Sequence, residues 1–577
     1  MAQIMPVLNK IFWEVALISV ALAVFQYVMR LRREKTLGQS EALQAGAEAS
    51  REETLGLSDR AHKILLGVTV AVGVLLRVWQ FGAVPGGFNQ DGAMAAVDAK
   101  ALADYATDRF GTFMPVHLYA WGFGQMSSLL SYMMAIFIKL FGMNPISARA
   151  PQLLMSLAGG AFFYLFVRDV FGKDVGLIAA MFAAINPWHL LQSRWALDCN
   201  LLPHFFMGGV YFLNKGFSKR RRDIFISMIF FSLCMYCYGI TIYTIPVFLF
   251  ATCIVYMRRK RLTMKDTLIS ARIYLALAWP FLLVMGVNFF KWETISLPFA
   301  TIQYFSGSAR SSDILMFSSE PLLKQLGANL RSLFNIVVLQ TKDLTANDIE
   351  GFGSMFMFTM PFVFAGFVEL FRHKTRGAKG LVLLSVLTGV WVGLLTNGVN
   401  INRINIIFYG VMMLASLGIY FVIKEIKYLK WPTLCIYAVA GVLLVGTYFG
   451  SYADTIKGQF FYGFGDALAT AEESGAEKIY VTSDIQSKGR GYVSEIMTLF
   501  YDETDALYFQ GKTNEDHGKT LLPYNQRFTY TSMSDEVVSG SLPENAAYVI
   551  MEGDRQFFDE AQFEITPFEK FCAVVRK

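Results

Sequence analysis

The chain has 577 residues, of which 54% are hydrophobic and 15% aromatic, and its mean hydropathy is +0.41. This composition is too apolar for a soluble protein of this length and indicates a polytopic membrane protein. The net charge of +6 does not indicate nucleic-acid binding, because Lys and Arg stand in short clusters between apolar runs, as they do in cytoplasmic loops.

The first apolar run, residues 11–29, is followed by a basic cluster between Arg30 and Lys35 and has no small-residue cleavage site after it. We therefore expect an uncleaved membrane helix whose N-terminus lies outside. The charged, small-residue-rich stretch that follows is expected to be a cytoplasmic linker. Residues 1–62 are thus predicted to form an extra N-terminal helix with its linker.

Eleven further apolar runs have roughly the length that a hydrocarbon core requires. Together with the first run they predict about 12 transmembrane helices and an α-helical polytopic fold. The eleven runs are residues 63–81, 148–168, 174–191, 201–215, 223–239, 241–257, 268–286, 352–371, 380–397, 404–423 and 431–450.

One apolar stretch, residues 125–141, fits two topologies. If it spans the membrane, every later basic cluster is placed outside, including residues 219–222 and 258–261. If it lies in the membrane interface, all of these clusters fall inside. Because basic residues in short loops favour the cytoplasmic side, we expect an interfacial segment.

This topology gives a transmembrane catalytic domain over residues 63–452 with two large outer loops, 82–147 and 287–351, and a short outer loop around Asp198. Residues 453–577 are expected to form a small extracytoplasmic α/β domain. Their strand-like runs, such as residues 478–482, 546–551 and 571–575, alternate with helix-like segments and carry no recognisable motif.

The first outer loop opens with Asp91, and Asp98 follows seven residues later, on the same face of an expected helix. Asp91 is either an N-cap, with the other carboxylates on a solvated face, or a functional group. His117 and Trp121 follow in the same loop. Aromatic rings beside a carboxylate suit a sugar, whose apolar face stacks while its hydroxyls need acceptors.

A second polar group lies in residues 186–200. Arg194 and Asp198 are four residues apart, so they form either a simple helical ion pair or a functional pair in which Arg194 grips a phosphate. Arg149 and Arg403 also reach the predicted outer face. Positive charges on that face oppose the charge bias, and a lipid phosphate at the membrane surface supplies a reason for them.

Other chemistries lack support in the sequence. It has no phosphate-binding P-loop, no dinucleotide-binding glycine motif and no clustered His ligands. Cys234 and Cys237 are one helical turn apart inside a span and are interpreted as packing residues. A transporter is disfavoured, because the charges lie at one outer face and transporters bind near the bilayer midplane.

The order of several short motifs resembles the GT-C membrane glycosyltransferases. These motifs are the acidic first loop, Arg149-Ala-Pro-Gln152, Phe163-Tyr-Leu-Phe-Val-Arg-Asp-Val-Phe-Gly172, Asn186-Pro-Trp-His189 with Arg194 and Asp198, Tyr236-Cys-Tyr-Gly-Ile-Thr-Ile-Tyr243, and Asn402-Arg-Ile-Asn405. They look most like the bacterial family 39-like proteins, which comprise protein mannosyltransferase and aminoarabinose transferase types. The resemblance covers roughly residues 60 to 425, and its specificity lies in order and topology.

The resemblance implies an inverting transfer of a sugar from a polyprenyl-phosphate-linked donor on the extracytoplasmic side of the cell membrane. It implies Asp91 as catalytic base and a role for Asp198 in the same site. Many relatives have Asp-Glu where this chain has Asp91-Gly92. Relatives often need no metal. We assign no metal-ligating residues, and a bound divalent ion remains an alternative.

The expected substrate-binding residues, for the lipid phosphate and the sugar, are Arg149, Arg194, Arg403, His117, Trp121, His189 and Gln90. The acceptor is a glycan, lipid or protein, and membrane lipids surround the chain. The alternative is a non-catalytic lipid-linked sugar carrier, a flippase or an envelope membrane protein. The two hypotheses differ in one geometric expectation: a transferase brings Asp91, Asp198 and at least one arginine together in one outer cavity.

Overall fold

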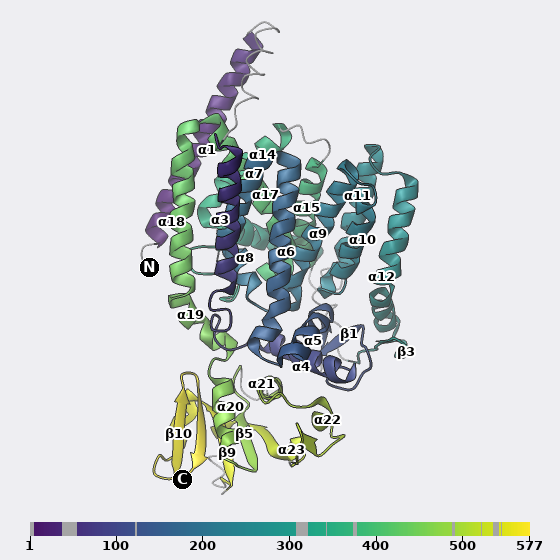
Figure 1. The fold of residues 1–577 in the computed structure, drawn as a ribbon, viewed down its shortest axis with the longest axis vertical. Helices are drawn as coiled ribbons and strands as arrows, with labels where there is room; N and C mark the ends of the chain where they lie inside the picture. Colours follow the sequence, from purple (N-terminus) through teal and green to yellow (C-terminus); the bar gives the residue numbers. More distant parts are fainter. Residues whose placement is uncertain are drawn as a thin grey trace.

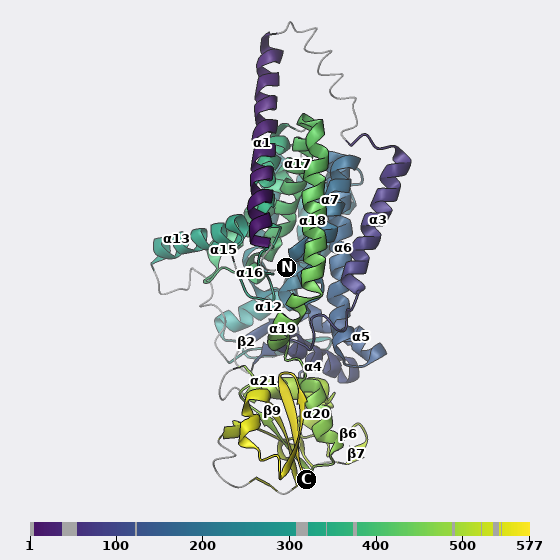
Figure 2. The same ribbon diagram turned by 90° about the vertical axis from the view of Figure 1, so that its left-hand side faces the viewer.

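The computed structural model describes residues 5–36, 55–121, 124–306, 321–341, 343–372, 378–486, 491–520, 522–534, 542–543 and 545–577. A bundle of long helices forms one part, and a smaller domain of strands and helices lies at one end of it (Figure 1). Short helices and hairpins from the outer loops lie between the two parts (Figures 1 and 2). The predicted class, an α-helical membrane protein with a small α/β C-terminal domain, is confirmed.

Each predicted apolar run contains a helix or a pair of helices. In chain order these are α1 (Met5–Thr36), α3 (Asp59–Val78), α6 (Pro145–Phe171), α7 (Lys173–Ile185), α8 (Pro187–Ser193), α9 (Asp198–Ser218), α10 (Asp223–Cys234), η1 (Gly239–Tyr243), α11 (Ile245–Arg258), α12 (Met264–Phe290), α14 (Met360–Arg372), α15 (Lys379–Leu395), α16 (Ile401–Ile404), η6 (Asn405–Ile407), α17 (Phe408–Glu425), η7 (Lys427–Leu429) and α18 (Lys430–Tyr448). Within the bundle α1 packs against α14 and α17, and α3 packs against α7 (Figure 2).

Seven of the described helices, counting continuous pairs as one, are long and apolar enough to cross a membrane, and a bent pair adds an eighth. The apolar helices α10 and α15 are shorter. The predicted total of about twelve spans therefore includes helices that fall below the length of a full crossing. The central helix α17 is buried among its neighbours, which explains why its sequence is apolar on every side.

The bent pair consists of α7 and α8, whose axes differ by 58° at Asn186. The local sequence explains the break. The Asn186 side chain accepts the backbone N–H of His189 at 3.0 Å, and Pro187 occupies the first position of the new helix. An Asn cap followed by proline is a strong signal for a helix start, so the span is interrupted here.

Residues 125–141 do not form a span. Strand β1 (His117–Ala120) pairs with β2 (Gly124–Ser127), and α5 (Leu129–Phe141) follows. This helix has 13 residues, about 20 Å, and is too short to cross a hydrocarbon core. Leu140 and Phe141 are exposed while Met134 is buried, as expected for an amphipathic helix in the membrane interface.

The outer loops also contain α4 (Gln90–Tyr105), which packs against α5 and α21. Strands β3 (Ile295–Leu297) and β4 (Ala300–Ile302) form a hairpin. A hydrogen bond joins this hairpin to the first outer loop: Val116 of the loop donates its N–H to the carbonyl of Thr301 in β4 at 3.0 Å. The second large loop then forms α13 (Leu322–Leu333), η4 (Phe334–Leu339) and η5 (Met357–Thr359). Residues 307–320 and Lys342 of this loop, and residues 37–54 of the predicted cytoplasmic linker, lie outside the described residues.

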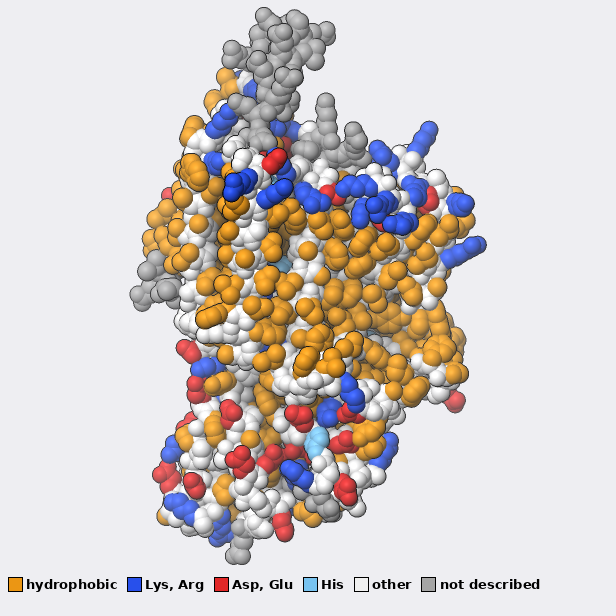
Figure 3. All heavy atoms as spheres, viewed as in Figure 1, with side chains coloured by type: hydrophobic (Ala, Val, Ile, Leu, Met, Phe, Trp, Pro, Cys, Tyr) orange, Lys and Arg blue, Asp and Glu red, His pale blue; other side chains and the backbone are white. Residues whose placement is uncertain are grey.

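Lys and Arg side chains gather at one end of the apolar belt, away from the C-terminal domain (Figure 3). The exposed basic clusters 219–222 and 258–261 are on this side. Acidic side chains are concentrated instead on the C-terminal domain in the same view (Figure 3). The two ends of the belt thus differ in charge, as the sequence predicts.

The C-terminal domain contains a five-stranded sheet in the order β10-β11-β9-β5-β8. Strand β5 is parallel to both of its neighbours, and β10 and β11 form an antiparallel hairpin. The elements are α19 (Ser451–Ile456), η8 (Lys457–Phe460), α20 (Phe464–Glu473), β5 (Lys478–Thr482), α21 (Gly491–Tyr501), α22 (Ala506–Phe509), β6 (Glu515–Asp516), β7 (Lys519–Thr520), α23 (Tyr524–Arg527), β8 (Phe528–Thr531), β9 (Ala546–Met551), η9 (Glu552–Phe557), β10 (Phe563–Phe568) and β11 (Phe571–Arg576). The three predicted strand-like runs are β5, β9 and β11. Helix α21 packs against α4, so this domain meets the loop that Asp91 opens.

Candidate active site

Asp91 is in the first turn of α4 and is half-buried. The N-cap of this helix is Asn89, whose side chain accepts the backbone N–H of Asp91 at 3.1 Å. The interpretation of Asp91 as the cap is therefore wrong. Its carboxylate Oδ1 instead accepts a hydrogen bond from the indole Nε1–H of Trp121 at 3.2 Å.

Gly92 brings α4 against the segment that leads to Asp198. A Cβ at this position would stand 2.8 Å from the Ala196 carbonyl oxygen and 3.1 Å from the Phe88 ring. Both neighbours are backbone or buried aromatic atoms, so any side chain here forces the two segments apart. Close packing therefore explains why a glycine stands at this position.

Asp198 is the first residue of α9, and its Oδ1 accepts the backbone N–H of Cys199 at 2.7 Å. The chain between α8 and α9 is not helical, so Arg194 and Asp198 are not one turn apart on a helix. The interpretation of these two residues as a helical ion pair is therefore wrong. The Asp198 carboxylate lies at the N-terminal end of α9, where the helix dipole stabilises its charge.

Arg403 reaches the same region through α16. Asn400 caps this short helix by accepting the Arg403 N–H at 3.0 Å, and the Arg403 guanidinium donates to the Gly398 carbonyl at 3.1 Å. Two residues later, the Asn405 side chain donates to the Cys199 carbonyl at 2.7 Å. Thus the junction of α16 and η6 is tied to the first turn of α9, which Asp198 begins.

Arg194 is fully buried and donates to backbone carbonyls. Its Nη1 contacts the carbonyls of Leu76 at 3.2 Å and Arg77 at 2.9 Å, and its Nη2 contacts those of Gln80 at 2.8 Å and Val84 at 2.6 Å. These carbonyls belong to the last turn of α3 and the chain just after it. A cation at a helix C-terminus compensates the dipole and satisfies carbonyls that lack helical partners.

Arg149 has a similar role on α6. It is fully buried in α6, donates to the carbonyls of Phe81 and Gly87, and lies 5.3 Å from the centre of the Phe88 ring. Together the two arginines hold residues 80–88, the chain that delivers Asp91 to the outer face. Arg149 and Arg194 are therefore buried arginines that bind backbone carbonyls beside the site, whereas Arg403 is half-buried on α16, which contacts α9.

His189 is buried inside the bundle. Its Nδ1 accepts from Arg77 Nη2 at 2.7 Å, and its Nε2 lies 3.0 Å from the Tyr409 hydroxyl, which also contacts His204 at 3.0 Å. Arg77 further donates to the carbonyls of Ala183 and Ala184 at the end of α7. The sequence prediction did not include Arg77, although an arginine within an apolar span is itself a signal of a specific partner.

The remaining predicted residues differ in position. Gln90 is the half-buried first residue of α4, directly before Asp91. His117 is buried, and its ring lies edge-on to Phe281 and Phe305 at 5.6 and 5.9 Å. Trp121 donates a hydrogen bond to Asp91. Gln90 and Trp121 therefore adjoin the candidate base, whereas His117 begins β1 and packs against Phe281 and Phe305.

Asp98, two turns after Asp91, is fully buried and forms an ion pair with Arg109. It also accepts the Arg109 backbone N–H at 3.0 Å. Burial raises the pKa of Asp98 to about 6, and the Arg109 charge opposes this rise. The pair closes the turn after α4, so Asp98 holds the loop together. The alternative that Asp98 lies on a solvated helix face is therefore wrong.

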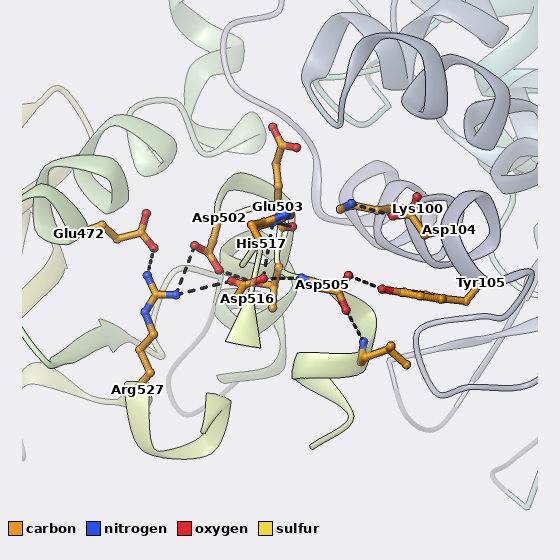
Figure 4. Close-up of polar contacts among 12 residues, drawn as sticks. Lys100, Asp104, Tyr105, Glu472, Asp502, Glu503, Asp505, Asp516, His517 and Arg527 are labelled. Atoms are coloured by element: carbon orange, nitrogen blue, oxygen red, sulfur yellow. Dashed lines mark hydrogen bonds and ion pairs between the residues drawn. The ribbon is translucent and has the colours of Figure 1, made fainter. Parts of the chain in front are cut away.

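A second polar group, which has no sequence motif, lies in the C-terminal domain (Figure 4). Arg527 lies 3.0 Å from Glu472, 3.6 Å from Asp502 and 3.7 Å from Asp516, on the wall of a cavity of about 850 Å³. Burial and the neighbouring Asp502 raise the pKa of Glu472 to about 8. This group touches the outer loop, because the Tyr105 hydroxyl at the end of α4 donates to Asp505 at 2.7 Å (Figure 4).

No group of three or more His, Cys, Asp or Glu side chains within the described ranges is arranged to hold a metal ion. The Trp121 indole donates to Asp91, the Cys199 backbone N–H donates to Asp198, and the Arg403 guanidinium lies on the neighbouring α16. Such groups suit hydrogen bonding to sugar hydroxyls and phosphate oxygens.

Comparison with known proteins agrees with this architecture. The family model described as dolichyl-phosphate-mannose-protein mannosyltransferase matches residues 127–284. ArnT from Cupriavidus metallidurans, in the apo state, superposes with a TM-score of 0.51 and 12% identity, covering 88% of this chain and 97% of ArnT. The same protein bound to undecaprenyl phosphate gives a TM-score of 0.53 and 11% identity, covering 89% and 97%.

The archaeal oligosaccharyltransferase AglB from Archaeoglobus fulgidus, in complex with an inhibitory peptide and a dolichol-phosphate, is more distant. Its TM-score is 0.42 with 15% identity, and the match covers 76% of this chain and 63% of AglB. No curated protein sequence matches the chain. The match to ArnT confirms, at the level of the fold, the GT-C resemblance that the motifs of the sequence indicate.

Proposed function

We propose that this protein is a membrane glycosyltransferase that moves a sugar from a polyprenyl-phosphate-linked donor to an acceptor hydroxyl, with inversion at the anomeric carbon. The mannosyltransferase family model over residues 127–284 and the shared fold with ArnT support this class of reaction. One ArnT structure contains undecaprenyl phosphate, which supports a lipid-phosphate donor by analogy. The acceptor is a glycan, a lipid or a protein.

The observation that carries the proposal is the state of the Asp91 carboxylate. It is half-buried, Asn89 replaces it as the helix cap, and one of its oxygens is held by Trp121 at 3.2 Å. A general base needs a fixed carboxylate whose second oxygen can accept a proton at hydrogen-bond distance. The bond from Trp121 fixes the Asp91 carboxylate at the mouth of the bundle, next to the segment that ends at Asp198.

The proposed reaction has one displacement step. Asp91 removes the proton from the acceptor hydroxyl while that oxygen attacks C1 of the sugar. The bond from C1 to the phosphate oxygen breaks, and its electron pair leaves with the lipid phosphate. Asp198 and Gln90 orient the sugar and acceptor, and Arg403 stabilises the charge that grows on the phosphate.

The other predicted binding residues take indirect roles in this proposal. Arg149 and Arg194 shape the chain before Asp91 through their bonds to backbone carbonyls. His117 supports the hairpin that carries Trp121. His189 stabilises the break between α7 and α8 together with Arg77.

We further propose that the site and the C-terminal domain face the extracytoplasmic side of the cell membrane. The support is the charge distribution: exposed basic clusters lie at the opposite end of the apolar belt (Figure 3). Short loops rich in Lys and Arg remain on the cytoplasmic side. Two contacts support a transferase over the carrier or flippase alternative: Gly92 beside Asp91 approaches Ala196, and Asn405 near Arg403 bonds the Cys199 carbonyl next to Asp198.

The test is transfer by the full chain purified in detergent. Polyprenyl-phosphate sugars are screened as donors, and mass spectrometry identifies the product on candidate acceptors. Asp91→Asn should abolish transfer. Asp104→Asn is the matched control, because Asp104 lies on the same helix but pairs with Lys100 and Lys139. Full activity of Asp91→Asn in a folded protein overturns the assignment of Asp91 as base.

A further inference from the structure

The hydrogen bond between Trp121 and Asp91 depends on an unusual backbone. Trp121 follows β1 and has a φ angle of +55°, in the left-handed region. Residues with a bulky side chain rarely adopt this conformation, and they keep it only where their surroundings hold them. The surroundings of Trp121 therefore hold it in this conformation, and its indole contacts show which segments do so.

One ring contact of the Trp121 indole comes from the C-terminal domain. The Tyr492 ring in α21 lies 5.6 Å from the Trp121 ring, with the two planes at 51°. This separation is within the range of favourable aromatic pairs. Tyr492 is more than 350 residues away from Trp121 in sequence, so only the folded chain brings the two rings together.

Helix α21 is itself fixed on the segment that carries Asp91. Phe500, at the far end of α21, stacks on Phe88 with 4.6 Å between ring centres and 10° between planes. Phe88 in turn donates its backbone N–H to the Phe460 carbonyl at 2.7 Å. The start of α4 therefore lies between contacts with α21 and η8, and Tyr492 occupies a defined place beside Trp121.

We propose that the C-terminal domain is part of the active site and that Tyr492 is a positioning residue for the base. Its ring holds the Trp121 indole so that Nε1–H keeps the Asp91 carboxylate in one orientation. This inference rests on the proposed function of Asp91. Small displacements of a catalytic group lower the rate steeply, by about 100-fold for a shift of 1 Å.

The experiment compares Tyr492→Ala with Tyr492→Phe in the full chain. Tyr492→Ala removes the ring and should lower kcat about 10- to 100-fold with little change in the donor KM, because binding contacts stay in place. Tyr492→Phe keeps the ring and should retain most of kcat. Tyr492→Leu, which fills the space without an aromatic face, should behave like Tyr492→Ala and covers the case in which alanine loosens the domain.

Tyr105→Phe is the matched control. It removes another contact between α4 and the C-terminal domain, the Tyr105–Asp505 hydrogen bond, without touching Trp121. Its kcat should match the wild type. An equal loss in Tyr105→Phe and Tyr492→Ala means that general docking of the domain is what matters, and overturns the positioning role.

Asp91→Asn separates the two proposals. An inactive Asp91→Asn together with wild-type kcat in Tyr492→Ala and Tyr492→Leu rejects the role of Tyr492 and leaves the base assignment standing. An equal loss in Tyr492→Phe and Tyr492→Ala assigns the effect to the hydroxyl group and rejects the ring contact. Full activity of Asp91→Asn rejects the base and the positioning role with it.

Discussion

The carbonyl oxygen of Ala196 lies 2.8 Å from the point where a Cβ of Gly92 would stand. This contact joins the two outer segments that carry Asp91 and Asp198, and it is possible only because Gly92 has no side chain. The second segment thus occupies the space that a side chain at position 92 would need.

Gly92→Ala should therefore destabilise the protein by about 1–3 kcal/mol, because the added methyl group overpacks a site without free volume. Transfer activity should fall as well, since the Asp91 and Asp198 segments separate. Thermal unfolding in detergent and kcat report the two effects. Gly67→Ala is the control: it is also a helical glycine, no atom lies within 4 Å of its Cβ position, and it should unfold at or above the wild-type temperature.

Arg194 should matter for stability more than for donor binding. Arg194→Lys removes a planar group that contacts four carbonyls around the end of α3, and an ammonium reaches only some of them. We expect a loss of about 3 kcal/mol or more, because buried carbonyls lose their partners. The melting temperature measures this loss. A stable Arg194→Lys protein with a raised donor KM would instead place Arg194 on the lipid phosphate.

Arg403 should matter for catalysis more than for stability. Its guanidinium is half-buried, and Arg403→Ala should leave the melting temperature close to that of the wild type. Loss of a cation that stabilises the leaving phosphate should lower kcat/KM about 100-fold. Steady-state kinetics with a defined polyprenyl-phosphate sugar checks this. Arg222→Ala, in the basic cluster at the other end of the belt, is the control and should not change the rate.

The C-terminal domain should lose stability as the pH rises. The pKa of Glu472 is raised to about 8 in the folded protein by burial and by Asp502. The folded state then binds more protons than the unfolded state between about pH 4.5 and pH 8, so the stabilising contribution is full below this window and lost across it. Hydrogen exchange of the β5 amides at pH 5, 7 and 9 measures the effect.

Glu472→Gln should remove this pH dependence, because an amide keeps a neutral hydrogen-bonding group next to Asp502. Glu477→Gln, at an exposed position on the rim of the same cavity, should leave the dependence intact. A pH-independent exchange rate in the wild-type domain would contradict the raised pKa of Glu472.

Much of the bundle was predictable because the length of an apolar run is a local property. The twelve predicted runs contain helices, and the charge pattern correctly removed residues 125–141 from the spans. The break at Asn186 was not predicted, although Asn186-Pro187 carries the cap and proline signals of a new helix. The hydropathy of α7 and α8 is continuous across this point, so hydropathy alone joins them.

The partners of the candidate site residues depended on the tertiary structure. Arg149, Arg194 and Arg403 are similar outer arginines in the sequence, yet the first two bind carbonyls at the ends of other segments and the third is half-buried. Which carbonyls are left without helical partners is decided by where distant helices end and how they pack. No spacing in the chain contains this information.

By itself, the sequence determined a polytopic helical membrane protein, an interfacial helix in the first outer loop, a C-terminal α/β domain and the acidic residue to test first. These follow from hydrophobic length, charge bias and periodicity, which act over neighbouring residues. Only the tertiary structure decided that Gly92 packs on Ala196, that Trp121 bonds Asp91, and that Tyr492 lies against Trp121. Those relationships join residues far apart in the chain, and close packing in three dimensions alone brings them together.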